Sequence, residues 1–289
     1  MEQAVIGQAA QGEGVTPPRS WRVRPAWAAS ALVVIGALGW ALWPHCTVEG
    51  EGKGSGRLSQ LWWPGCGAWN RPVTGDLSFP TPARQPQAPG GDDSIPNREA
   101  EARLAMQLAE LKPGMTVADV GAGEGYYTRL LAPMVGPKGR VLAEDIDETV
   151  LRKLGLLVQN EKLDNVAIRH GTDTNPRLPK DSFDRVFLIH MYHEVKQPYG
   201  FLWNIWPALK PGGKVVIVDR DQPTGRHGVP RNLLQCELRA SGFRNTKSVL
   251  IPGTNVYYAE FQTQEMRPKP SQIAACQEGP SVASSVPAG

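Results

Sequence analysis

The chain has 289 residues and a formal net charge of +3 at pH 7, and 20% of its residues are charged. This length suits one domain of about 160–200 residues with extensions at its ends. Lysine and arginine are scattered along the sequence and form no basic stripe, so the composition argues against a nucleic-acid-binding protein.

An apolar run without charge occupies residues 26–43. Its length of about 18 residues is at the lower limit for a bilayer span, which needs roughly 20. Arginines precede the run and tryptophans stand near both of its ends, as at membrane interfaces. We expect a single transmembrane anchor; a cleaved signal peptide and a buried core helix are the alternatives, although no small-residue cleavage site follows Trp43. The arginines predict that residues 1–25 form a cytoplasmic tail and that the following domain lies across the membrane.

Residues 44–96 have the composition of a linker, with glycines at alternate positions over 50–56 and prolines spread from 72 to 96. Cys46 and Cys66 are interpreted as unrelated thiols, with a disulfide as the alternative in an oxidising compartment. No cysteines have the clustered spacing of a zinc site. Cys236 falls in an apolar helical pattern and is expected in the core, whereas Cys276 is expected in a C-terminal tail.

The expected domain begins with a helix over residues 97–111, which Lys112-Pro113-Gly114 ends. A short apolar strand follows over 116–120, then a glycine-rich loop over 121–125 and an amphipathic helix from Tyr126. The loop would lie at the carboxyl end of a strand and the amino end of a helix, where open α/β sheets bind ligands. We therefore predict a ligand site at this loop.

The loop departs from the dinucleotide fingerprint, because its glycines follow the pattern Gly-x-Gly-x-Gly rather than Gly-x-Gly-x-x-Gly. Asp119 also stands two residues before the first glycine. A carboxylate at that place favours a cationic group over a pyrophosphate.

The rest of the domain alternates between strand and helix patterns and ends in an antiparallel hairpin. A helix around Leu202, Ile205, Trp206 and Leu209 is expected to be weakened in its last turns by Pro207. After residue 263 the chain turns polar without periodicity, so residues 263–289 are expected to be disordered. The other elements are expected over residues 140–146, 148–162, 166–171, 181–190, 215–219, 229–240, 245–251 and 255–261.

Acids and a histidine stand at the carboxyl ends of two of these strands. Asp145 can accept hydrogen bonds from a ribose diol, and a solvated pair with Glu144 is the alternative. His193 follows the fourth strand and suits a general base, because the unperturbed pKa of imidazole is near 6.5. Glu194 is expected to orient it, and a packing role for His193 is the alternative.

Four linked segments resemble the class I S-adenosylmethionine-dependent methyltransferases. They are the Asp119-x-Gly-x-Gly-x-Gly loop, the acid at 145, Ser182-Phe-Asp-x-Val and Leu209-Lys-Pro-Gly-Gly. Each is weak alone, but their order and spacing together are specific. Within the family the chain looks most like bacterial predicted methyltransferases with hydrophobic N-termini, which share its Gly-Tyr-Tyr-Thr and Tyr-His-Glu segments.

The resemblance implies S-adenosylmethionine as cofactor and assigns its contacts residue by residue. The methionine end is assigned to the motif loop, at Asp119, Gly121, Ala122, Gly123 and Gly125. Asp145 would bind the ribose, Ile146 would pack on the adenine and His190 would line the cofactor wall. Asp173 would meet the adenine amino group, with a turn or helix-cap role as the alternative.

The predicted fold is a doubly wound, Rossmann-like α/β domain over residues 97–262, with a seven-stranded sheet, an antiparallel C-terminal hairpin and three αβα layers. The predicted function is in-line transfer of a methyl group to an oxygen or nitrogen of a small-molecule or lipid-like acceptor. A nicotinamide-dependent oxidoreductase and a membrane-tethered, non-catalytic module are the alternatives. A bacterial inner membrane is the expected location, and the side of the domain stays open because the cofactor is made in the cytoplasm.

Overall fold

The computed structural model describes residues 77–86 and 98–278. The predicted anchor at residues 26–43, the tail before it, and Cys46 and Cys66 lie outside the described residues. Across the two described ranges, none of the helices is both long enough and apolar enough to span a bilayer.

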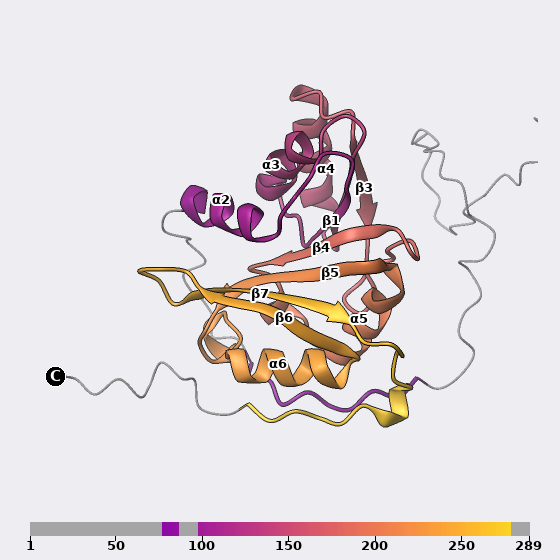
Figure 1. The fold of residues 1–289 in the computed structure, drawn as a ribbon, viewed down its shortest axis with the longest axis vertical. Coiled ribbons are helices and arrows are strands. Elements are labelled where there is room, and N and C mark those ends of the chain that lie inside the picture. The colour runs from indigo at the N-terminus through magenta and orange to yellow at the C-terminus, as the bar shows by residue number, and fades with distance from the viewer. Residues whose placement is uncertain (1–76, 87–97, 279–289) are drawn as a thin grey trace, which may run out of the picture. The chain divides into compact units, whose positions relative to one another are not determined.

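Seven strands form one sheet in the order β3-β2-β1-β4-β5-β7-β6 (Figure 1). The pairs among β1 to β5 are parallel, and β7 runs antiparallel between β5 and β6. The strands are β1 (Thr116–Val120), β2 (Arg140–Asp145), β3 (Val166–His170), β4 (Phe183–Ile189), β5 (Leu209–Arg220), β6 (Phe243–Leu250) and β7 (Val256–Thr263). The predicted doubly wound sheet with an antiparallel C-terminal hairpin is confirmed.

Helices cover both faces of the sheet, which makes three layers (Figure 1). The helices are α2 (Arg98–Leu108), α3 (Tyr126–Val135), α4 (Glu148–Asn160), α5 (Pro198–Ile205) and α6 (Arg231–Ala240). Val117 of β1 joins the core beneath α2 and α3, and its neighbour Ala118 joins the core beneath α5 and α6. Successive side chains of a strand point to opposite faces of the sheet. A strand that is covered by helices on both faces therefore carries apolar side chains at successive positions, as Val117 and Ala118 do.

The expected helix around Leu202 to Leu209 is shorter than predicted. Helix α5 ends at Ile205, a short 3₁₀-helix covers Trp206–Ala208, and Leu209 already begins β5. Pro207 explains the early end, because a proline lacks the N–H that an interior helical position donates.

The predicted linker and tail are both wrong over their described parts. Residues 77–86 pack on the domain, and the Phe79 ring lies 6.0 Å from that of Trp203 on α5. Residues 264–278 also pack there, where Cys276 forms a disulfide with Cys236 of α6. Figure 1 shows the two segments running side by side along α6. The composition gave no sign of this packing, because the contacts that dock both segments depend on partners far away in the sequence.

Candidate functional site

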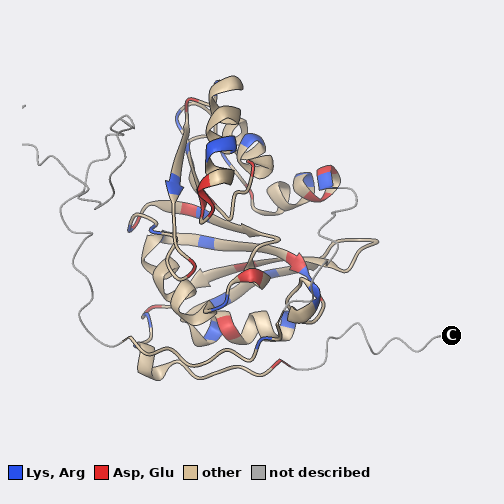
Figure 2. Ribbon diagram, turned by 180° about the vertical axis from the view of Figure 1, so that it is seen from behind, with Lys and Arg blue, Asp and Glu red and all other residues tan. Residues whose placement is uncertain are grey.

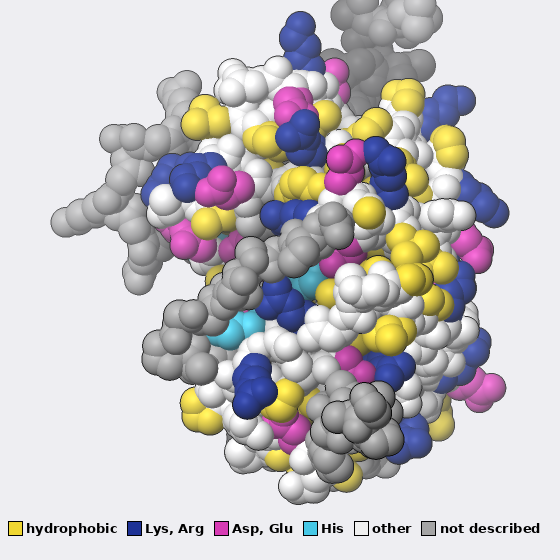
Figure 3. Space-filling model, turned by 90° about the vertical axis from the view of Figure 1, so that its left-hand side faces the viewer, with side chains coloured by type: hydrophobic (Ala, Val, Ile, Leu, Met, Phe, Trp, Pro, Cys, Tyr) yellow, Lys and Arg dark blue, Asp and Glu magenta, His cyan; other side chains and the backbone are white. Residues whose placement is uncertain are grey.

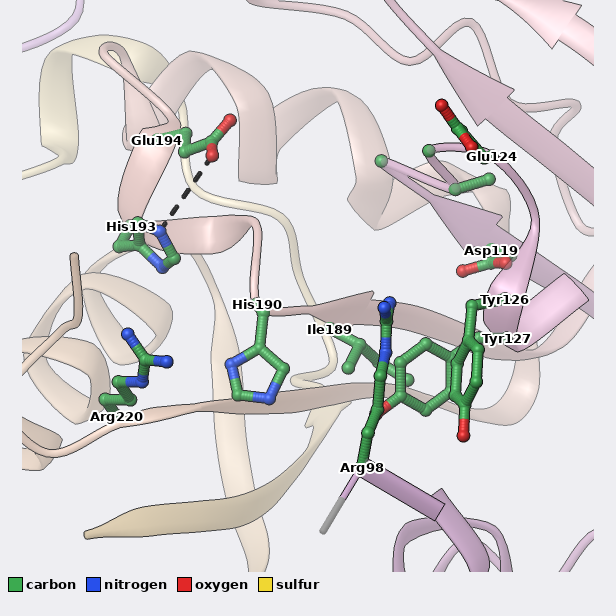
Figure 4. A pocket seen from close by; sticks show the side chains of 13 residues that line it. Arg98, Asp119, Glu124, Tyr126, Tyr127, Ile189, His190, His193, Glu194 and Arg220 are labelled. Carbon is green, nitrogen blue, oxygen red and sulfur yellow. Dashed lines mark ion pairs between the residues drawn. The ribbon is translucent and has the colours of Figure 1, made fainter. Parts of the chain in front are cut away.

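A cavity of about 360 Å³ opens at the carboxyl ends of β1, β4 and β5. This volume is in the range of pockets that hold small molecules. Its lining residues come from the glycine loop, from α2 and from the ends of β4 and β5, and Figure 4 shows their side chains converging on it. They are Arg98, Asp119, Gly121, Ala122, Gly123, Glu124, Tyr126, Tyr127, Ile189, His190, His193, Glu194 and Arg220. In the space-filling view, histidine and basic side chains are visible within a hollow of the surface (Figure 3).

The glycine loop brings backbone close to this cavity. Gly123 has φ +57 and no atom within 4 Å of where a Cβ would be, and its N–H donates to Asp145 Oδ2 at 2.9 Å. Gly125 has φ +91, and a Cβ there would lie 2.5 Å from Leu154 Cδ1 of α4. Conformation therefore favours glycine at the first position, and both conformation and close packing favour it at the second.

Three carboxylates gather beneath the loop. Burial raises the pKa of Asp119 to about 6, against the opposing hydrogen bond from Thr128 Oγ1 at 2.6 Å. Burial, together with the nearby charge of Asp145, raises the pKa of Glu144 to about 8. Of these buried acids, Asp119 lines the cavity, where a carboxylate suits a positively charged ligand group.

Four of the predicted cofactor residues, Gly125, Asp145, Ile146 and Asp173, do not line the cavity. Asp145 lies directly behind the loop, where it accepts the Gly123 N–H, and Ile146 beside it is 57% exposed. Asp173 is exposed in the loop after β3, whose turn hydrogen bonds are made by Thr172 and Asn175. The residues predicted for the adenosine half thus lie outside the cavity lining, with Ile146 and Asp173 exposed.

His193 is held by a carboxylate that the sequence interpretation did not assign. Its Nδ1 lies 2.9 and 3.1 Å from the two carboxylate oxygens of Asp219, which is fully buried at the end of β5. The predicted orienting group, Glu194, has its Oε1 4.0 Å from His193 Nε2 (Figure 4). Because an ionised carboxylate only accepts hydrogen bonds, the Asp219 contact places a proton on Nδ1 and leaves Nε2 as the basic nitrogen.

A second histidine of the cavity lining, His190, belongs to a separate hydrogen-bond network. His190 Nε2 lies 2.8 Å from Glu101 Oε1 of α2, and the same oxygen accepts the Tyr127 hydroxyl at 2.7 Å. His190 has φ +52, a left-handed conformation that costs energy for a residue with a side chain. This network joins α2 to the end of β4, and Arg98 of α2 stacks over the Tyr126 ring at 4.0 Å.

The residues that sequence reasoning missed differ in how far they could have been found. Asp219 ends a predicted strand, so the same argument that selected Asp145 would have selected it. Arg220, the next residue in the sequence, could have been found in the same way. Glu101 and Arg98 lie on a helix whose pattern carries no sign of a site, and only the folded chain brings them to the cavity.

In the described ranges, no three His, Cys, Asp or Glu side chains are arranged to hold a metal ion. Figure 2 shows acidic and basic residues interspersed over helices and strands, without a stripe of one sign.

Comparisons with known proteins agree on one family. Residues 118–217 match the family model described as "Methyltransferase domain". A demethylmenaquinone methyltransferase from a Geobacillus species is 32% identical over 119 residues, which are 41% of this chain and 51% of the relative. One from Listeria welshimeri is 30% identical over 118 residues, 41% of this chain and 50% of the relative. The chain thus spans about half the length of these curated relatives.

A comparison of the fold with solved structures also finds a methyltransferase. The crystal structure of a SAM-dependent methyltransferase from Aquifex aeolicus superposes with a TM-score of 0.53 and 26% identity. The similarity covers 56% of this chain and 88% of that structure.

Proposed function

We propose that this chain, which carries a class I S-adenosylmethionine-dependent methyltransferase domain, methylates a hydroxylated aromatic ring of the quinol class. The observation that carries the proposal is the His193–Asp219 pair on the cavity wall, whose Nδ1 to Oδ1 distance is 2.9 Å. A histidine held in one tautomer by a buried carboxylate is suited to remove a proton from a weakly acidic hydroxyl.

The cavity suits the cofactor at several points. Asp119 offers a buried carboxylate to the positively charged end of the cofactor, and the loop at Gly121, Gly123 and Gly125 lets that end approach the backbone. Asp145 is proposed for the ribose diol. The exposed surface at Ile146 and Asp173 is proposed for the adenine. When bound, S-adenosylmethionine supplies an electrophilic methyl group on a sulfonium.

The remaining steps belong to the acceptor and to His193. Nε2 of His193 takes the proton of the acceptor hydroxyl, and the electron pair left on the oxygen, or conjugated onto a ring carbon, forms the new bond to the methyl carbon. The carbon–sulfur bond breaks and its electron pair stays on sulfur. If the new bond is to carbon, the ring then loses the hydrogen from that carbon as a proton. Positioning in line supplies much of the remaining barrier reduction.

The relatives and the charge of the cavity both favour a quinol. The two curated relatives are named for demethylmenaquinone, and removal of a hydroxyl proton from a quinol leaves a phenolate anion. In Figure 4 the Arg220 side chain lies on the side of the cavity that holds both histidines, whereas Arg98 stacks over the Tyr126 ring. Opposite charges at short range favour the anionic acceptor there.

We also propose that residues 26–43 anchor the domain in the membrane that holds such a lipid-like acceptor, and that the domain lies on the oxidising side. The Cys236–Cys276 disulfide supports an oxidising compartment, and the arginines before the apolar run support the same side. This location requires a supply of cofactor from across the membrane.

Maleimide labelling of the full-length chain tests this location. In chain taken from cells with and without prior reduction, the label is expected to reach Cys236 and Cys276 only after reduction. Labelling of both thiols without reduction would place the domain in the cytoplasm.

The function is tested on the full-length chain in two steps. In calorimetric titrations we expect S-adenosylhomocysteine to bind with micromolar affinity and NADH not to bind; tight NADH binding would favour the oxidoreductase alternative. With radiolabelled S-adenosylmethionine we expect methylation of 1,4-naphthoquinol, and His193→Gln should lower kcat about 10²–10⁴-fold.

Other outcomes of this test overturn parts of the proposal. Methylation of catechol but not of naphthoquinol would replace the quinol class by simple hydroxyl acceptors. Binding of S-adenosylhomocysteine without transfer to either acceptor would favour the tethered, non-catalytic module. Full activity of His193→Gln would remove the general base.

A further inference from the structure

We propose that Arg84, in the segment 77–86 before the domain, is a positioning residue that holds the turn carrying His193. The inference rests on the proposed role of His193 as the base. It concerns the 3₁₀-helix η2 (Tyr192–Glu194), which presents His193 and Glu194 to the cavity.

Arg84 binds η2 at both of its ends. Its Nη1 donates to the carbonyl oxygen of Tyr192 at 2.7 Å and to that of Val195 at 3.0 Å. Tyr192 is the first residue of η2, and Val195 is the residue that follows its last turn. A three-residue helix has almost no internal hydrogen bonds to hold its direction, and η2 has no side-chain cap at its start. The guanidinium therefore supplies bonds that the short helix lacks.

The other side of the guanidinium is fixed to α6. Nε and Nη2 of Arg84 donate to the two carboxylate oxygens of Glu237 at 3.2 and 2.7 Å, a bidentate pair with side chains 8% and 0% exposed. Burial lowers the pKa of Arg84, but the charges of Glu237, Tyr192 and Asp219 and the hydrogen bonds to Glu237 together raise it above its ordinary value. Arg84 thus stays charged and links α6 to η2 as a rigid fork.

Tyr192 completes the attachment. Its hydroxyl donates to Glu237 Oε2 at 2.8 Å, and its ring lies 4.7 Å from the Arg84 guanidinium carbon. His193 is the next residue, and its imidazole is held by Asp219 of β5. Neighbouring residues of one short turn are therefore fixed to different elements, and the direction of the imidazole depends on both attachments.

The segment that carries Arg84 is itself tied down. The backbone N–H of Gln85 donates to Thr224 Oγ1 at 2.8 Å, and that hydroxyl donates to Glu278 of the C-terminal segment at 2.9 Å. The disulfide at Cys236 joins the same C-terminal segment to α6, one residue before Glu237. Residues outside the predicted domain limits therefore support the turn that carries the base.

The test compares Arg84→Met with Lys214→Met. Both remove the nearest cation from a fully buried glutamate that still accepts a tyrosine hydroxyl: Glu237 with Tyr192, and Glu260 with Tyr258. Glu260 keeps a second, more distant cation, Lys247 at 4.0 Å. Lys214 lies in the middle of β5 and does not line the cavity. The control therefore reproduces the loss of a buried ion pair without touching η2.

We expect Arg84→Met to lower kcat for 1,4-naphthoquinol about 10–100-fold, with unchanged affinity for S-adenosylhomocysteine. Nitrogen-15 NMR of the imidazoles, with His193→Gln for assignment, should show His193 changing from one tautomer to a mixture. Lys214→Met should lose a similar amount of thermal stability and change neither readout. Equal kcat and a single tautomer in both variants would overturn the proposal.

Arg84→Lys serves if the methionine variant does not fold. A lysine keeps the charge but cannot form the fork to Glu237 and reach two carbonyls at once, so an intermediate loss of kcat is expected. Wild-type kcat and tautomer in Arg84→Lys would overturn the proposal. If His193→Gln keeps full activity, the assignment of His193 as the base fails, whatever the activity of the Arg84 variants. If His193→Gln is inactive and Arg84→Met has wild-type kcat, only the positioning role of Arg84 fails.

Discussion

The two ends of the cavity are built in different ways. The cofactor end comes from one continuous segment, Asp119 to Gly125, backed by Asp145 from the neighbouring strand. The acceptor end is assembled from α2, the ends of β4 and β5, and, behind them, α6 and residues 77–86. A local segment can be recognised from spacing alone, whereas an assembled wall requires the folded chain.

The two ends also differ in charge. Buried acids lie at the cofactor end, where the pKa of Asp119 is raised to about 6 and that of Glu144 to about 8. The guanidinium group of Arg220 lies at the proposed acceptor end beside the histidines, whereas Arg98 stacks over the Tyr126 ring (Figure 4). A cationic donor and an anionic acceptor would therefore each meet the opposite charge, which favours their orientation before reaction.

The largest expected effect is at the acceptor end. Asp219→Asn should lower kcat about 10²–10⁴-fold, because the amide N–H can donate to His193 Nδ1 and so favour the tautomer that carries its proton on Nε2, which can no longer act as a base. Asp221→Asn is the matched control, since Asp221 is a buried acid on the same strand end whose partner is Arg231 at 2.6 Å. Steady-state kinetics with 1,4-naphthoquinol measure both. An equal loss in the two variants would mean that Asp219 has only a structural role.

The same contrast explains how much could be predicted. Thr116–Val120 was predicted to the residue, because a buried strand and a glycine turn leave a local signal. The doubly wound sheet with its antiparallel hairpin followed from the alternation of strand and helix patterns and from the two closing strand patterns. Asp219 was passed over although it ends a predicted strand, so its omission was avoidable. Glu101 and Arg84 were not predictable, because their roles depend on pairing with residues 89 and 108 positions away.

Asp145→Ala tests the cofactor end and should weaken S-adenosylhomocysteine binding by about 1–3 kcal/mol, or roughly 5–150-fold. The lost carboxylate would have accepted the ribose hydroxyls, and it also fixes the Gly123 N–H at 2.9 Å. Asp147→Ala is the control, because Asp147 caps α4 through Thr149 and Val150 and should cost only stability, about 1 kcal/mol. Calorimetric titration of both variants with S-adenosylhomocysteine measures the change in affinity. Wild-type affinity in Asp145→Ala would remove the ribose assignment.

Glu144 links the acidic end to stability. Its Oε1 has no hydrogen-bond partner among the described residues, and burial raises its pKa from an ordinary 4.5 to about 8. The folded state thus holds the proton more tightly than the unfolded chain. Its stabilising contribution is complete below about pH 4.5 and is lost as the pH rises through about 8.

Glu144→Gln should therefore remove a pH dependence. At pH 9 we expect the variant to be more stable than the wild type by at least about 1 kcal/mol, or about 2–4 °C in Tm, and the difference should shrink at pH 5. Glu148→Gln, on the exposed side of α4, should show no such slope. Thermal unfolding between pH 5 and pH 9 measures the dependence of Tm on pH. The same dependence in Glu144→Gln and in the wild type would mean that Glu144 ionises normally.

The smallest expected effect concerns Asp119, whose burial raises its pKa to about 6. If only the ionised carboxylate attracts the cationic end of the cofactor, at pH 5 about one molecule in ten is competent to bind, and affinity falls about tenfold from its value at pH 7.5. Asp119→Asn should bind weakly at both pH values, without the tenfold change, while Asp145→Ala should keep it. Titrations of S-adenosylmethionine at the two pH values separate the roles. A tenfold change that persists in Asp119→Asn would assign the titrating group to Glu144 or Asp145, and the acidic end would then act as a cluster rather than through Asp119.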